Sequence, residues 1–241
     1  MDADAYGDVR LVGLYDLDNP AGEDHAYYRA LAAGTRKVLD FGCGTGLLTR
    51  SLVAPGRVVI GVDPSPTMLG YARRRPGADV VRWIDGDYRA VEPGGDVDLV
   101  VSSGNTMMHV SGADHVPALS ALAGALRSGG MIAFESRHPA ARAWEQWTRE
   151  ATDGERDTPV GRLREWLDLI EVADGRVVFD AHNVFPDGTV AVYRNVLHFR
   201  SPAEITTDLR RAGFTDVKID GGWHGEALTD ESRLLVVRAR K

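Results

Sequence analysis

The chain lacks several features that mark membrane, secreted or metal-cluster proteins. Cys43 is its only cysteine, so it can form neither an internal disulfide nor, by itself, a cysteine-based zinc or iron–sulfur site. No segment approaches the roughly 20 consecutive apolar residues that a membrane-spanning helix needs. The first residues, Met1–Ala5, include two aspartates and no apolar run, so we expect no signal peptide and a cytoplasmic protein.

Basic residues are also few relative to acidic ones. The 28 Lys and Arg residues face 35 Asp and Glu residues, which gives a formal net charge of -7 at pH 7. A nucleic-acid partner would need a basic surface, so the composition favours a small-molecule partner over nucleic acid or a membrane. No cluster of His, Cys, Asp and Glu has the spacing of metal ligands, so we expect no bound metal. The length suits one α/β domain with a modest insertion, in a monomer or homodimer.

What the sequence does contain is an alternation of strand-like and helix-like segments. The strand-like segments are residues 37–41, 57–62, 80–84, 97–102 and 131–135. The helix-like segments that precede or separate them are residues 23–33, 47–53, 66–75 and 114–127. This alternation predicts a mainly parallel sheet with helices on both faces.

The pattern changes near residue 160. Residues 162–172, 177–185 and 190–199 are strand-like and are separated by turn signals without helices, which predicts an antiparallel meander of three strands. A helix at 202–212 and strands at 215–220 and 232–240 then resume the α/β pattern. We expect a single domain, 1–241, whose parts are a cofactor-binding core at 35–136, the inserted meander at 160–200 and a final helix with two strands at 201–241.

A glycine-rich loop stands where the first strand turns into a helix. Residues 40–46 read Asp-Phe-Gly-Cys-Gly-Thr-Gly. Glycines at such a turn allow positive φ and let the backbone approach a ligand beside a helix N-terminus. A dinucleotide fingerprint needs a glycine three residues after Gly44, but that residue is Leu47, and the lysine of a P-loop is also absent.

Acidic residues end the next two strands. Asp63 follows the second strand and could accept hydrogen bonds from both hydroxyls of a ribose. Asp87, in Asp85-Gly86-Asp87-Tyr88, follows the third strand and could accept from an adenine amine. With Asp40, these acids would line the carboxyl edge of one sheet, where open α/β sheets bind ligands. The alternative is that each is an ordinary loop acid or helix cap.

These segments resemble the motifs of class I S-adenosylmethionine (SAM)-dependent methyltransferases. Residues 38–46 resemble the first motif, 61–68 the second, 85–87 the third, and 126–130 the turn before the fifth strand. The resemblance implies a Rossmann-like sheet of seven strands in the order 3-2-1-4-5-7-6, with the seventh antiparallel. It also implies SAM as methyl donor and S-adenosylhomocysteine (SAH) as product.

The resemblance further indicates which residues contact the cofactor. Met68 matches a methionine that packs on adenine, and Tyr15 and Tyr28 come from an N-terminal segment that family members use as a lid. Tyr27 and Tyr28 point to different helix faces, so at most one should reach the cofactor. The expected contacts are Tyr15, Tyr28, Asp40, Gly42, Cys43, Gly44, Asp63, Pro64, Met68, Gly86, Asp87, Tyr88, Ser103 and Asn105.

The meander resembles that of small-molecule N-methyltransferases, such as amino-sugar dimethylating enzymes, in which it roofs the substrate site. It therefore predicts a small-molecule acceptor methylated on nitrogen, for which positioning and exclusion of water suffice. The expected substrate contacts are Arg137, His182, Tyr193 and Arg194, with Glu135 as a further candidate after the fifth strand.

Three alternatives remain open. His109 and His138 are candidate catalytic residues, and a histidine base would suit methylation of a hydroxyl oxygen instead. A nucleotide-dependent oxidoreductase or epimerase could use a similar sheet, although the missing fingerprint glycine disfavours it. The chain could also bind SAM without turnover.

Overall fold

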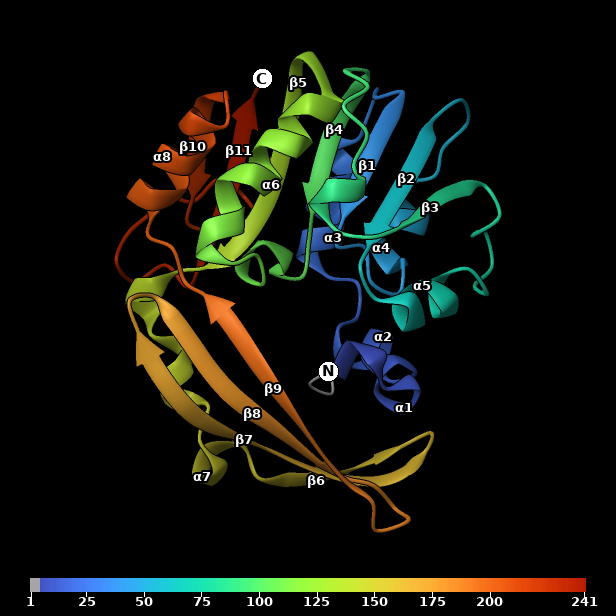
Figure 1. Cartoon of the computed structure of the whole chain (residues 1–241), viewed down its shortest axis with the longest axis vertical. Coiled ribbons are helices and arrows are strands. Elements are labelled where there is room, and N and C mark those ends of the chain that lie inside the picture. Colours follow the sequence, from blue (N-terminus) through green and yellow to red (C-terminus); the bar gives the residue numbers. More distant parts are fainter. Residues whose placement is uncertain (1–4) are drawn as a thin grey trace.

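The computed structural model describes residues 5–241, which form two sheets and the helices packed on them (Figure 1). The α-helices are α1 (Val9–Val12), α2 (Tyr15–Asp18), α3 (Glu23–Leu31), α4 (Leu47–Ser51), α5 (Pro66–Ala72), α6 (Gly112–Ala125), α7 (Arg149–Thr152) and α8 (Pro202–Arg211). The short 3-10 helices are η1 (Ala5–Gly7), η2 (Tyr88–Ala90), η3 (Thr106–Met108), η4 (Pro139–Ala141) and η5 (Ala143–Gln146).

Seven strands form the larger sheet, sheet A, in the order β10-β11-β5-β4-β1-β2-β3. Its strands are β1 (Lys37–Phe41), β2 (Val58–Asp63), β3 (Val81–Asp85), β4 (Val97–Ser102), β5 (Leu126–Arg137), β10 (Thr215–Asp220) and β11 (Leu234–Arg240). Strands β1 to β5 pair in parallel, whereas β11 is antiparallel to both β5 and β10. The predicted Rossmann-like fold and strand order are therefore confirmed.

Helices on both faces explain why the central strands are apolar throughout. On one face, Leu39 of β1 and Ile132 of β5 pack with residues of α6 and α8. On the other face, Val38 of β1 packs with residues of α3 and α4. A parallel strand that is buried on both sides reads as a continuous apolar run rather than an alternating one.

Local sequence signals set several helix starts. Ser65 caps α5 by accepting a hydrogen bond from the Met68 amide, and Pro66 occupies the first turn, where no intrahelical donor is needed. Ser201 and Glu204 form a reciprocal capping box at the start of α8. Helix α6 ends at Ala125, two residues earlier than expected, because the chain enters β5 at Leu126.

The inserted region forms a second, antiparallel sheet, sheet B, in the order β6-β7-β8-β9. Its strands are β6 (Gly154–Thr158), β7 (Gly161–Ala173), β8 (Arg176–Val184) and β9 (Val190–His198). The sequence predicts the last three, so the insertion contains one strand more than expected. Strand β6 has the sequence Gly-Glu-Arg-Asp-Thr and lies at the edge of the sheet, so it lacks the apolar alternation that identifies a half-buried strand.

The N-terminal helices α1 and α2 join sheet B to the rest of the molecule. Leu14, which precedes α2, is buried with Leu163 of β7 and with Phe185. The Arg10 guanidinium also lies 3.6 Å from the centre of the Phe185 ring. These contacts place the N-terminal segment between sheet B and the carboxyl ends of the sheet A strands (Figure 1). Within the described chain, no helix has the length and apolar character to cross a membrane.

Candidate active site

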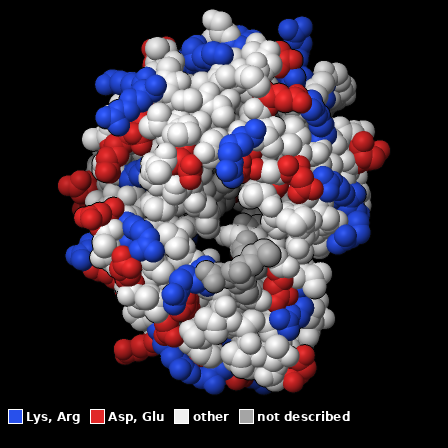
Figure 2. Space-filling view, viewed as in Figure 1, with Lys and Arg blue, Asp and Glu red and all other residues white. Residues whose placement is uncertain are grey.

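Two adjoining cavities open at the carboxyl edge of sheet A. The large cavity has a volume of about 890 Å³ and the small cavity about 380 Å³. The space-filling view shows the surface hollowed between sheet A and sheet B (Figure 2). Both cavities are lined by Tyr15, Gly42, Gly44 and Gly104, so they meet at the glycine loop.

The glycine loop has the backbone conformation that the sequence predicts. Gly42, Gly44 and Gly46 all have positive φ, at 72°, 52° and 71°. A Cβ atom on Gly42 would lie 2.1 Å from the Thr106 side chain, so this position also requires the close approach that only glycine permits. In the large cavity the loop therefore contributes only glycines, Gly42 and Gly44, whereas Cys43 and Thr45 also line the small cavity.

Asp63 is held at the large cavity by backbone donors. The Gly44 amide donates to one carboxylate oxygen at 2.8 Å, and the Ser65 amide donates to the other at 2.8 Å. These bonds fix the carboxylate against the glycine loop at the end of β2. Pro64 and Met68 line the same cavity, so three expected cofactor contacts lie together in it.

Asp40 lies behind the loop and lines neither cavity. It is fully buried, and the Thr49 hydroxyl donates to its Oδ2 at 2.6 Å. Burial raises the pKa of Asp40 to about 7, an effect that the Thr49 hydrogen bond only partly offsets. Among the described residues, its Oδ1 atom has no hydrogen-bond partner.

Residues 86–88, which follow the third strand and were expected to contact the cofactor, lie outside both cavities. The Asp87 carboxylate accepts from the Arg89 backbone amide at 2.9 Å and forms an ion pair with the Arg89 guanidinium, which lowers the Asp87 pKa. The Tyr88 hydroxyl donates to Asp114 at 2.8 Å. Neither residue, nor Gly86, lines the two cavities. An adenine contact at Asp87 stays a prediction, and it would have to compete with Arg89.

The small cavity collects polar groups from several elements. Cys43, Ser103 and Asn105 line it as expected, together with Glu135. The Asn105 backbone amide donates to one oxygen of the Glu135 carboxylate at 2.7 Å, and the Tyr28 hydroxyl donates to the other oxygen. Tyr28 is fully buried, donates to Glu135 and lines neither cavity, so its expected cofactor contact stays a prediction.

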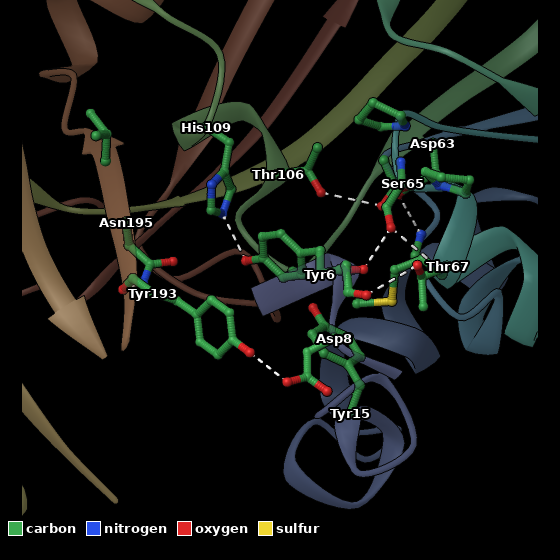
Figure 3. Close-up of a pocket in the computed structure, with 18 of the residues that line it drawn as sticks. Tyr6, Asp8, Tyr15, Asp63, Ser65, Thr67, Thr106, His109, Tyr193 and Asn195 are labelled. Atoms are coloured by element: carbon green, nitrogen blue, oxygen red, sulfur yellow. Dashed lines mark hydrogen bonds between the residues drawn. The ribbon is translucent and has the colours of Figure 1, made fainter. Parts of the chain in front are cut away.

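The far side of the large cavity is formed by the N-terminal segment, η3 and β9 (Figure 3). The Tyr6 hydroxyl and the His109 Nε2 atom lie 3.3 Å apart, and the two rings meet edge to face. From β9, the Tyr193 hydroxyl donates to Asp8, which also pairs with Arg10. The Arg10 hydrogen bonds are the main reason why the Asp8 pKa falls to about 2, so Asp8 is ionised at neutral pH.

Two of the four expected substrate contacts line the large cavity. Tyr193 and Arg194 do so, although the Arg194 guanidinium also pairs with Asp180 at 2.8 Å. Arg137 lies outside both cavities with its guanidinium 5.8 Å from the Trp147 ring, and burial lowers its pKa.

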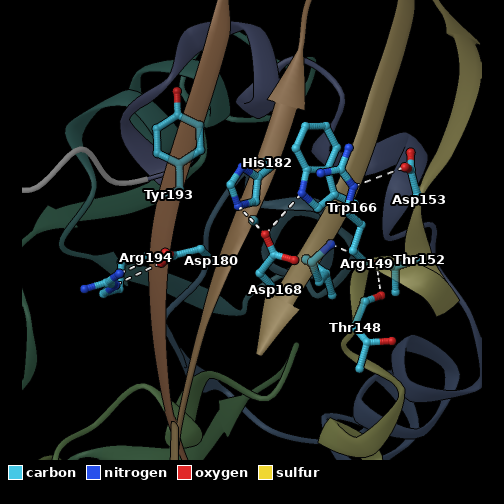
Figure 4. Close-up of polar contacts among 12 residues, drawn as sticks. Thr148, Arg149, Thr152, Asp153, Trp166, Asp168, Asp180, His182, Tyr193 and Arg194 are labelled. Atoms are coloured by element: carbon cyan, nitrogen blue, oxygen red, sulfur yellow. Dashed lines mark hydrogen bonds and ion pairs between the residues drawn. The ribbon is translucent and has the colours of Figure 1, made fainter. Parts of the chain in front are cut away.

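His182 also lies outside both cavities, within a cluster of side chains on sheet B (Figure 4). Its ring stacks on Trp166 with the centres 4.6 Å apart, and its Nε2 atom lies 2.9 Å from Asp168. Arg149 covers the Trp166 ring at 4.4 Å. These contacts give His182 a packing environment on the sheet instead of the expected place at the substrate.

The two candidate bases are separated by the fold. His109 lines the large cavity. His138 is buried outside both cavities, and its Nδ1 atom lies 3.0 Å from the Ser232 carbonyl oxygen, where the ring nitrogen can only donate. The hydrogen bond ties the segment after β5 to the segment before β11, which leaves His109 as the imidazole at the large cavity.

The sequence did not single out several residues that line the cavities. They are Tyr6, Asp8, Thr67, Thr106 and Asn195 at the large cavity, and Asp16 and His25 at the small one. Three of them, Tyr6, Thr106 and Asp16, come from helices of three or four residues, which are too short to produce an apolar period. Within the described residues, no group of three or more His, Cys, Asp and Glu side chains is placed to hold a metal ion.

Comparison with known proteins gives a consistent set of relatives. Residues 38–130 match the family described as a methyltransferase domain. A cypemycin N-terminal methyltransferase from a Streptomyces species is 29% identical over 211 residues, which cover 86% of this chain and 84% of that protein. The match therefore extends well beyond the glycine-loop core.

Solved structures with the same fold cover nearly the whole chain. The sugar N-methyltransferase KedS8 from a Streptoalloteichus species superimposes with a TM-score of 0.73 at 18% identity, over 100% of this chain and 96% of that one. The SAM-bound amino pentose methyltransferase CalS10 from Micromonospora echinaspora gives a TM-score of 0.71 at 20% identity, over 95% and 97% of the two chains. At these identities the likeness shows a shared fold, which includes sheet B.

Proposed function

We propose that this chain is a class I SAM-dependent methyltransferase that methylates a nitrogen atom of a small polar molecule held in the large cavity. The observation that carries the proposal is the ionised Asp8 carboxylate in the lining of that cavity, opposite the cofactor loop. The names of the relatives, among them an N-terminal methyltransferase and sugar N-methyltransferases, support a nitrogen acceptor.

The residues at the glycine loop fit SAM. Its sulfonium supplies an activated methyl group, so the protein need not provide a nucleophile. Asp63 presents to this cavity a carboxylate that two backbone amides hold in place, and a carboxylate at the end of the second strand suits the hydroxyls of a ribose. Met68 lies in the same cavity, where its thioether can pack on adenine.

The acceptor side suits a cationic amine. Asp8 presents a carboxylate, shared with Arg10 and Tyr193, to which an ammonium group can also bond, and Tyr6, Tyr15 and Tyr193 offer ring faces and hydroxyls in the same cavity. An amine must lose its proton before it can attack a methyl carbon, and the neutral form then needs no strong base. The main tasks of these residues are thus to orient the nitrogen on the axis of displacement and to exclude water.

A hydroxyl acceptor is the alternative, because His109 lines the cavity and could serve as base. Screening amines and hydroxyl compounds for SAH release separates the two cases. With an amine, the rate should rise as the substrate ammonium deprotonates, and His109→Gln should cost little. With a hydroxyl, His109→Gln should lose on the order of 10²-fold in rate.

His138→Gln is the matched control, since that imidazole lies outside both cavities. Its turnover should resemble that of the wild type with either class of acceptor. Turnover on hydroxyl compounds alone, with a large loss in His109→Gln and none in His138→Gln, would overturn the nitrogen proposal.

A further inference from the structure

The small cavity is acidic, and the proposed chemistry in the large cavity does not explain why. Four carboxylate side chains line it, those of Asp16, Glu23, Asp24 and Glu135. No lysine or arginine is among its lining residues in the described chain. Its histidine, His25, has a pKa lowered by burial, which favours the neutral imidazole. Its lining residues therefore carry a net negative charge.

Glu135 is the most deeply buried of the four acids, with 3% of its surface exposed. Its carboxylate accepts from the Tyr28 hydroxyl and from the Asn105 backbone amide, and the charged neighbour that acts on its pKa is another acid, Asp24. Two donors leave about two acceptor positions of a carboxylate available. A buried carboxylate of this kind is stabilised when a cation approaches it.

Tyr15 connects Glu135 with the ribose-binding side. This tyrosine lines both cavities. Burial raises its pKa to about 12, and the charges of Asp63 and Glu135 add to the effect. A ligand whose ribose lies at Asp63 therefore reaches Glu135 by extending past Gly42 and Gly44 into the small cavity.

We propose that Glu135 is the anionic contact for the α-ammonium group of SAM, and that Tyr28 is the positioning residue that holds its carboxylate. SAM is a nucleoside at one end and an amino acid at the other, so it matches a large cavity with a ribose acceptor joined to a small acidic one. Glu135 lies on β5, outside the glycine loop and the motifs of the second and third strands. The proposal concerns cofactor binding and does not depend on the identity of the methyl acceptor.

The ionisation of Glu135 should respond to the ligand. Burial raises its pKa to about 7, while the hydrogen bonds from Tyr28 and Asn105 lower it. The other charged groups that act on this site are acidic, namely Asp24 on α3 and Asp40 on β1. An ammonium at this position favours the ionised carboxylate, so SAH binding should release a proton and should strengthen as pH rises from 6 to 7.5.

Calorimetry with two ligands tests the proposal without turnover. SAH carries the amino-acid group, whereas 5′-methylthioadenosine keeps the adenosine part and lacks that group. Glu135→Gln should weaken SAH binding by about 10- to 100-fold and leave 5′-methylthioadenosine binding unchanged, which also shows that the variant is folded. Glu92→Gln is the matched control, because Glu92 is an exposed acid outside both cavities and its variant should bind SAH like the wild type.

Proton release gives a second readout. In buffers of different ionisation enthalpy at pH 7, SAH should release roughly half a proton more from the wild type than from Glu135→Gln, because a group with a pKa near 7 is about half protonated there. Tyr28→Phe removes a donor to the carboxylate, so the pH at which SAH affinity rises should move upward.

Three results would overturn the proposal. Glu135→Gln could weaken SAH and 5′-methylthioadenosine equally, or release as many protons as the wild type, or Tyr28→Phe could leave the pH midpoint of SAH binding in place. If Glu135→Gln does not fold, the wild type decides the matter. Equal proton release on binding SAH and 5′-methylthioadenosine would then exclude an ammonium contact at Glu135.

Discussion

Burying Glu135 should make the stability of the ligand-free protein depend on pH in a way that one substitution removes. The pKa of this carboxyl is about 7 in the folded chain, against 4.5 for an exposed glutamic acid. Folding therefore favours the protonated form. The stabilisation of the folded state by this protonated carboxyl is fully present below about pH 4.5, and it is lost as pH rises through about 7.

The size of this effect follows from the shift. One pKa unit corresponds to about 1.4 kcal/mol, so the free energy of unfolding should lose on the order of 3 kcal/mol between pH 4.5 and pH 8 through Glu135 alone. Asp40, whose pKa is also about 7, should add a loss of the same sign. Glu135→Gln removes the ionisation, so it should become more favourable relative to the wild type as pH rises.

Urea unfolding of the two proteins from pH 5 to pH 8 measures the difference directly. Asp98→Asn is the control, because hydrogen bonds from Arg127 and two backbone amides lower the Asp98 pKa to about 2. Asp98 thus stays ionised across this range, and its variant should differ from the wild type by a constant amount. If the free energy of unfolding of Glu135→Gln also differs from that of the wild type by a constant amount, then ionising Glu135 in the folded protein does not cost the free energy deduced from its burial.

Three further substitutions test the cavities themselves. Asp63→Asn should raise the Kd for SAH by about 10- to 100-fold in calorimetry, because the ribose loses a charged acceptor, and an unchanged Kd in a folded variant would remove Asp63 from the site. Gly42→Ala should abolish measurable SAH binding, whereas Gly56→Ala, at nearly the same φ but with open space around it, should cost only about 1 kcal/mol of stability. Tyr193→Phe loses its hydrogen bond to Asp8, so the KM for an amine acceptor should rise while SAH affinity stays constant, and a shift in SAH affinity would contradict this assignment.

The cofactor side was predictable because its chemistry depends on backbone geometry that has a sequence signature. Positive φ at Gly42, Gly44 and Gly46 requires glycine, and the alternating spacing distinguishes the loop from a dinucleotide fingerprint. The strand order follows from the β-α alternation and the family resemblance, and the structure confirms it. The sequence also predicted that Asp63 lies at the ligand-binding edge of the sheet, because it ends a strand and the carboxyl ends of parallel strands share one edge.

The acceptor side was harder to predict because it depends on how distant segments meet. His109 and His138 are equal candidates in the sequence, but only the fold shows that His138 bonds to the Ser232 carbonyl while His109 lines the cavity. The structure is likewise needed to see that the Asp87 carboxylate is already bonded to Arg89, which lies only two residues away. Asp8 gives no sequence signal beyond capping a four-residue helix.

The two halves of the site therefore have different sources and can change separately. The cofactor half is formed by short strand-to-helix turns of sheet A, where glycine and strand-end acids restrict the choice of residue. The proposed acceptor half is formed by η1 with Asp8, by η3 and by β9, which meet only in the folded protein and use ordinary side-chain contacts such as Tyr193 to Asp8. Substitutions in β9 alter the lining of the large cavity without touching the glycine loop. We therefore expect substitutions in sheet B to change acceptor preference while SAM binding is kept.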